Sequence, residues 1–84
     1  MKIYTVNDVK AGAYLQPFFM RANAEAQRAF ASLVNDPKHQ FGIHHSDYTL
    51  YQIGEFDEDT GIIKSNTPLS LGNGNDFFLQ GDAA

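Results

Sequence analysis

The sequence has 84 residues, of which 43% are hydrophobic and 19% charged, and its formal net charge is −4. This length and composition are typical of one folded domain, so a second core and a disordered chain are both excluded. The absence of cysteine excludes disulfides, thiol catalysis and Cys-ligated metal sites, and it suits a reducing compartment. The excess of acidic residues argues against simple electrostatic coating of DNA or of a membrane.

The chain begins with two predicted strands. Met1–Val6 is dominated by branched and aromatic residues, which is typical of a strand. Tyr14–Met20 predicts a second strand. Within it, Pro17 indicates an edge position or a bulge, because proline cannot donate a ladder hydrogen bond.

A helix is predicted between Asn23 and Pro37. The side-chain oxygen of Asn23 is expected to cap the first turn, and the helix ends before Pro37 because proline pushes the preceding residue out of the helical conformation. Five apolar residues repeat at helical spacing and form one stripe that must pack against the sheet: Ala26, Ala29, Phe30, Leu33 and Val34.

The second half of the chain predicts a loop, a central strand and a hairpin. Lys38–Asp47 has no hydrophobic period and is expected to be an ordered loop anchored by Phe41 and Ile43. Thr49–Phe56 carries apolar residues on both faces, which favours a central strand. Asp57–Gly61 predicts a turn, since glycine accepts the positive φ that closes it. Two short strands are expected after it, at Ile62–Ser65 and Pro68–Leu71.

These elements predict an α+β fold, in which one α-helix packs on one face of a small antiparallel β-sheet of four or five strands in the order β-β-α-β-β. Residues 1–72 are expected to form a single α+β domain, and residues 73–84 a flexible C-terminal tail. One helix covers only part of one sheet face, and so short a chain gains little net stability from its own core. A homodimer is therefore expected.

The candidate metal and acid–base groups cluster within nine residues: His39, His44, His45 and Asp47. Imidazole and carboxylate groups can bind divalent metals or transfer protons, but this spacing fits no helix face, so polar loop residues are the favoured interpretation. Asp57–Gly61 is similar to the start of a calcium loop, yet the twelfth position is Pro68, which offers no ligand. We therefore expect no metal, no cofactor and no catalytic residue.

The uneven charge suggests one surface that could meet nucleic acid. Residues 1–46 carry five bases and three acids, whereas residues 47–84 carry one base and seven acids. Phosphate-binding cations next to stacking aromatics are typical of single-strand binders. The candidates are Lys10, Arg21, Arg28 and Lys38, with Tyr14 and Phe18 as stacking residues. Phe18 and Phe19 must lie on opposite strand faces, so only one can stack on a base, and a core or dimer contact is the alternative for each aromatic.

Several short segments together carry a family resemblance. They are Met1–Tyr4, Tyr14–Phe19, Ala26–Phe30, Val34–Pro37, Ser46–Leu50, Gly54–Asp57 and Thr60–Gly61. As a set, over roughly residues 1–72, the sequence resembles the small nonstructural protein of gokushovirus-type microviruses, the phage open-reading-frame-five family. The resemblance implies a phage with a circular single-stranded DNA genome, a protein that stays in the host bacterial cytoplasm outside the virion, and no catalytic residues.

Two hypotheses follow for a nonenzymatic protein. The resemblance implies a DNA-associated regulator that acts when duplex replication switches to single-stranded genome synthesis or packaging. The alternative is a protein-interaction module that binds a phage replication or capsid protein, or a host factor, without contacting DNA. No apolar run reaches the ~18 residues of a membrane span, so no membrane partner is expected.

Overall fold

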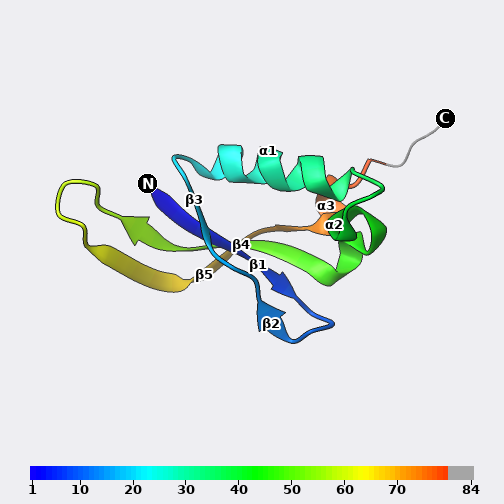
Figure 1. Cartoon of the computed structure of the whole chain (residues 1–84), viewed down its shortest axis with the longest axis horizontal. Helices are drawn as coiled ribbons and strands as arrows, with labels where there is room; N and C mark the ends of the chain where they lie inside the picture. The colour runs from blue at the N-terminus through cyan, green and yellow to red at the C-terminus, as the bar shows by residue number, and fades with distance from the viewer. Residues whose placement is uncertain (80–84) are drawn as a thin grey trace.

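Five antiparallel strands form one sheet, and a long helix lies across one face of it (Figure 1). The computed structural model describes residues 1–79. Its strands are β1 (Lys2–Asp8), β2 (Ala13–Tyr14), β3 (Phe18–Met20), β4 (Tyr48–Phe56) and β5 (Ile63–Asn73). Its helices are α1 (Asn23–Val34), α2 (Gln40–Ile43), a 3-10 turn η1 (His45–Asp47) and α3 (Gly74–Phe77). None of these helices is long and apolar enough to cross a membrane.

The strands follow the spatial order β2-β1-β4-β5, and β3 also pairs with β1. Because β4 occupies one edge of β1, the short strands β2 and β3 share the other edge. Every pairing is antiparallel. Beyond the sheet, the β4–β5 hairpin projects past the start of α1 (Figure 1). The predicted α+β class and antiparallel sheet are confirmed, and β4 is central as expected.

The structure corrects three details of the predicted fold. The expected strand Tyr14–Met20 is two short strands, because the chain leaves the ladder around Pro17, which has no N–H to donate. The two short strands expected after the hairpin are the single strand β5. Two short helices, α2 and α3, accompany α1 and lie together beside its C-terminal end (Figure 1). Such short helices form without a hydrophobic period when side chains cap them.

The start of α1 differs from the expectation, whereas its end does not. Ala22 occupies the N-cap position without a side-chain hydrogen bond, so the predicted capping role of Asn23 is wrong. The Oδ1 atom of Asn23 instead accepts hydrogen bonds from the Tyr4 hydroxyl at 2.9 Å and the Gln52 amide at 3.1 Å. The side-chain amide of Asn23 therefore ties the helix to β1 and β4. Burial of Tyr4 raises the pKa of the Tyr4 hydroxyl. The helix ends at Val34, before Pro37 as predicted.

The core lies between α1 and the sheet, and Phe30 is its centre. Its ring contacts those of Phe41, with centroids 5.6 Å apart, and Phe77, at 5.7 Å. The buried core residues are Tyr4, Val6, Ala26, Phe30, Val34, Phe41, Tyr48 and Leu50. Phe41 anchors its loop as expected, but Ile43 is 57% exposed and does not, because α2 is too short to bury both residues.

Ordered contacts extend beyond residue 72, where the sequence places the start of a tail. Asn73 forms a capping box with Asp76 at the start of α3. The side chain of Asn75 contacts the His45 ring at 2.6 Å, and Phe78 stacks on that ring with centroids 4.0 Å apart. Residues 73–79 therefore pack against η1 and α1, and the rest of the predicted tail, residues 80–84, lies outside the described residues.

Candidate functional site

The sheet face that points away from α1, here called the outer face, is the most distinctive surface of the protein. Side chains alternate along each strand, and Val6 and its partner Leu50 lie in the core, so Thr5 and its partner Tyr51 must point outward. The same alternation and register assign the remaining members. The outer face consists of the mainly apolar residues Ile3, Thr5, Tyr14, Phe19, Tyr51, Ile53, Phe56 and Ile63, together with the polar residues Asn7, Thr49, Ser65 and Ser70.

Two aromatic pairs cross β1 on the outer face. Tyr14 and Tyr51 meet edge to face with centroids 5.8 Å apart, and Phe19 and Phe56 do so at 6.0 Å. Edge-to-face geometry is the arrangement that aromatic quadrupoles favour. Each pair reaches from the β2–β3 edge across β1 to β4. The rings therefore cover the outward side chains of β1, which are buried although no helix covers them.

A hollow of about 280 Å³ lies on the outer face beside Tyr14. Its lining combines the β2–β3 connection with β4 and β5: Thr5, Tyr14, Leu15, Pro17, Ile53 and Pro68. The Thr5 hydroxyl is already satisfied, since it donates to the Leu15 carbonyl at 2.7 Å. The hollow contains no charged side chain, so it suits an apolar side chain or a flat ring.

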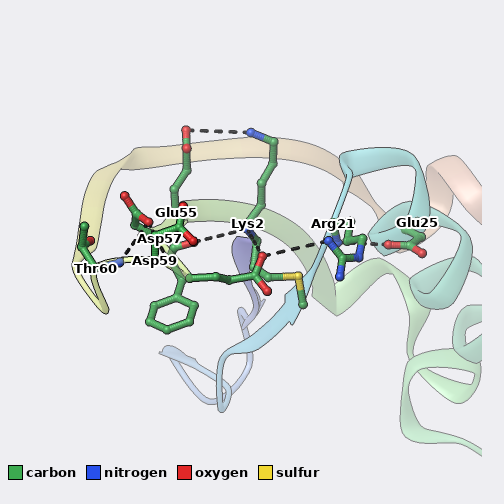
Figure 2. Close-up of polar contacts among 10 residues, drawn as sticks. Lys2, Arg21, Glu25, Glu55, Asp57, Asp59 and Thr60 are labelled. Atoms are coloured by element: carbon green, nitrogen blue, oxygen red, sulfur yellow. Dashed lines mark hydrogen bonds and ion pairs between the residues drawn. The ribbon is translucent and has the colours of Figure 1, made fainter.

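The strand residues that form the outer face carry no charge. Among the charged strand residues, Lys2 and Glu55 are register partners on the opposite face, and their Nζ and Oε2 atoms lie 3.8 Å apart (Figure 2). Lys64 pairs with Glu55 in the register of β5 and shares that face. An aromatic, uncharged face of this kind matches the central part of a protein interface better than a phosphate-binding surface.

The four predicted cations lie in different parts of the fold. Lys10 lies in the β1–β2 turn, and Arg28 lies in the middle of α1. Arg21 and Lys38 flank α1, whose twelve residues separate them by about 18 Å of helix. The guanidinium of Arg21 is also 4.0 Å from the Glu58 carboxylate in the hairpin turn.

The structure reverses the choice made from sequence between the two neighbouring phenylalanines. Phe18 stacks on the buried Tyr4 at 5.6 Å and packs against the core, whereas Phe19 is 46% exposed on the outer face. Their opposite orientations are confirmed, but only the position of Tyr4 in the core decides which one points outward. Tyr14 is 54% exposed, as its predicted stacking role requires.

Two histidines of the predicted cluster hold short helices in the structure. The Nδ1 atom of His39 accepts a hydrogen bond from the Phe41 amide at 3.0 Å and caps α2, and His45 holds α3. In the part of the chain that the structure describes, no three His, Asp or Glu side chains are placed where they could hold a metal ion. Nothing in the sequence around His45 indicated its contact with residues thirty positions later.

The acidic turn between β4 and β5 is also locally satisfied. The Oδ1 atom of Asp57 accepts hydrogen bonds from the amides of Asp59 at 2.9 Å and Thr60 at 3.2 Å (Figure 2). These bonds lower the pKa of the Asp57 carboxyl. Gly61, with φ at +75°, closes the turn as predicted.

Together these features define a small α+β protein with one helix-covered sheet face and one exposed aromatic face. The chain belongs to the Phage ORF5 protein family, whose model matches residues 1–77. It is thus a phage protein, and the resemblance found in the sequence is confirmed. No curated protein and no solved structure matches it.

Proposed function

We propose that this phage protein is a nonenzymatic interaction module and that its outer face binds a second copy of the chain. The observation that carries the proposal is the absence of charge on an exposed aromatic sheet face. Aromatic residues are enriched, and charged residues depleted, at the centres of protein interfaces. Two such faces can pack as the layers of a β-sandwich, about 10 Å apart.

The size of the outer face supports a second copy as its partner. Tyr14 and Phe19, both about half exposed, each offer on the order of 100 Å² of apolar area. The protein measures 49 by 25 Å along its two longest axes, and each partner in a standard interface buries ~800 Å². Pairing through the β5 edge is less favourable, because Lys64 and Pro68 are residues that protect edge strands from further pairing.

The dimer would serve genome synthesis or packaging by contacting a phage replication or capsid protein, or a host factor. This wider role rests on the family to which the chain belongs. We place it in the host bacterial cytoplasm, outside the virion.

Sedimentation at micromolar concentration tests the dimer. The wild-type protein is expected to sediment as a dimer, and Phe19→Ser to raise the dissociation constant about thirtyfold, the effect of losing an aromatic hot spot worth about 2 kcal/mol. Ile43→Ser is the matched control, because Ile43 is similarly exposed on α2, away from the outer face. A wild-type monomer, or equal effects of the two variants, would refute the proposal.

DNA association through the same face is the second candidate function. It is supported by the exposed ring of Tyr14 beside a hollow that can accept a flat ring, since base stacking on aromatic side chains is the main sequence-tolerant contact of single-strand binders. In this proposal Lys10, Arg21, Arg28 and Lys38 supply separate phosphate contacts around the protein.

Fluorescence anisotropy with a labelled oligo(dT) distinguishes this function from the first. About four phosphate contacts predict that log K falls with log salt with a slope near −3, and Tyr14→Ala should cost about 1–3 kcal/mol of binding free energy. The control is Tyr48→Phe, because Tyr48 is buried on the other side of β4. No affinity at low salt would eliminate direct DNA binding and leave the protein-interaction function intact.

A further inference from the structure

The outer face carries both a hollow and an exposed phenyl ring, and the two are matched in size. The hollow beside Tyr14 has a volume of about 280 Å³. A closed apolar cavity of about 150 Å³ holds a benzene molecule, so the hollow has room for one phenyl ring. The Thr5 hydroxyl in its lining already donates to the Leu15 carbonyl. A ring that enters the hollow therefore leaves this hydroxyl paired.

A dimer formed by two outer faces has to fill this hollow. Packing at the centre of a protein interface is as dense as in a protein interior, and side chains that line a void lose contacts with the other side. In a symmetric dimer every contact occurs twice, so an empty hollow would remove these contacts twice. A side chain of the partner copy is therefore needed in the hollow.

Phe19 is the side chain of the outer face that suits the hollow. Three large side chains of this face are well exposed, namely Tyr14 at 54%, Phe19 at 46% and Ile63 at 60%. Tyr14 is itself part of the lining, and its hydroxyl needs a hydrogen-bond partner when it is buried. Ile63 pairs with Phe56, one residue beyond the pairing of β4 with β1. Phe19 is a large ring without a polar atom, and it lies beside the paired part of the sheet.

The register places Phe19 where a two-fold axis can bring it to the hollow. Phe19 pairs with Ile3 and Tyr14 pairs with Asn7, so both lie along the same edge of β1, four residues or about 13 Å apart. A two-fold axis in the interface that crosses β1 between these pairs makes the two copies of β1 antiparallel and exchanges the two positions. Each ring then meets the hollow of the other copy, and both contacts form together.

We propose that the phenyl ring of Phe19 enters the hollow of a second copy of the chain, around a two-fold axis that crosses β1 between Ile3 and Asn7. The inference rests on the proposed function, because it names the contact by which the outer face recognises its partner copy. The strands of the two sheets are then aligned, which is one of the two arrangements that packed sheets adopt.

Nuclear Overhauser contacts between copies test the inference on the wild-type protein. A mixture of isotope-labelled and unlabelled chains, measured with an isotope filter, reports only contacts that cross the dimer. The ring protons of Phe19 are expected to contact the side chains of Ile53 and Pro68, which line the hollow. Contacts of Phe19 with the partner's Phe19 or the partner's Ile63 in their place would overturn the inference and leave the dimer intact. A protein that sediments as a monomer would refute both.

Narrowing the hollow gives a second measurement. Ile53→Phe should raise the dissociation constant of the dimer about tenfold, as overpacking does. In the Phe19→Ser background the same substitution should change it by less than about twofold, because no ring then competes for the space. Ile63→Ser is the matched background, since Ile63 is exposed on the same face but does not line the hollow, and there the tenfold effect should persist.

Equal effects of Ile53→Phe in the two backgrounds would overturn the inference without touching the dimer itself. If Ile53→Phe fails to fold, the contacts measured between wild-type copies decide the result.

Discussion

Replacing Phe30 by alanine is expected to lower the free energy of unfolding by about 3–5 kcal/mol, the usual cost of deleting a buried aromatic ring. The ring is only 3% exposed and joins α1 to both short helices through Phe41 and Phe77. Because single domains are stable by about 5–15 kcal/mol in total, this loss brings the protein close to unfolding. Urea denaturation followed by circular dichroism, at one fixed protein concentration, measures it.

Phe30→Leu provides the comparison for this variant. Leucine keeps most of the volume and fits the helix, so this substitution should cost less than about 1.5 kcal/mol. If both substitutions cost the same small amount, the ring of Phe30 would not be the contact that unites α1, α2 and α3. The cost of Phe30→Leu therefore measures the packing of the ring, and the further cost of Phe30→Ala measures the apolar volume that the position needs.

The elements that local patterns define could be predicted from the sequence. The apolar stripe of α1 and the stop before Pro37 depend on residues only a few positions apart, so the end of the helix was predicted correctly. The same holds for the central strand β4 and for the turn that Gly61 closes. In each case a local sequence rule and the tertiary structure favour the same conformation.

Features that depend on distant partners could not be predicted. Asn23 has the character of a helix cap, yet Tyr4 and Gln52 take its side-chain oxygen once the sheet lies beneath it. Alternation showed that Phe18 and Phe19 diverge, but only the register with β1 decides which of them reaches the outer face. The aromatic pairs of the candidate site could not be predicted from the sequence either, because each pair joins residues more than thirty positions apart across β1.

The C-terminal segment shows this limit most clearly, and Gly74→Ala tests it. The run from Gly72 to Gly74 has the composition of a loop, but a methyl group on the buried Gly74 would overlap the backbone carbonyl of His45. Backbone cannot move aside as the end of a flexible side chain can. The substitution should therefore push α3 away from η1 and cost about 1–3 kcal/mol or more, as overpacking does.

The loss from Gly74→Ala should concentrate at the C-terminal segment. Displacing α3 breaks the contact between Asn75 and His45 and the stacking of Phe78, so amides of α3 should exchange with solvent much faster than those of β4. Gly61→Ala is the contrasting variant, because its positive φ strains alanine by about 1–2 kcal/mol while its surroundings are open. It should leave exchange in α3 unchanged. Equal exchange in the two variants would mean that η1 does not hold α3 in place, and the segment after Gly72 would then be the tail that its composition predicts.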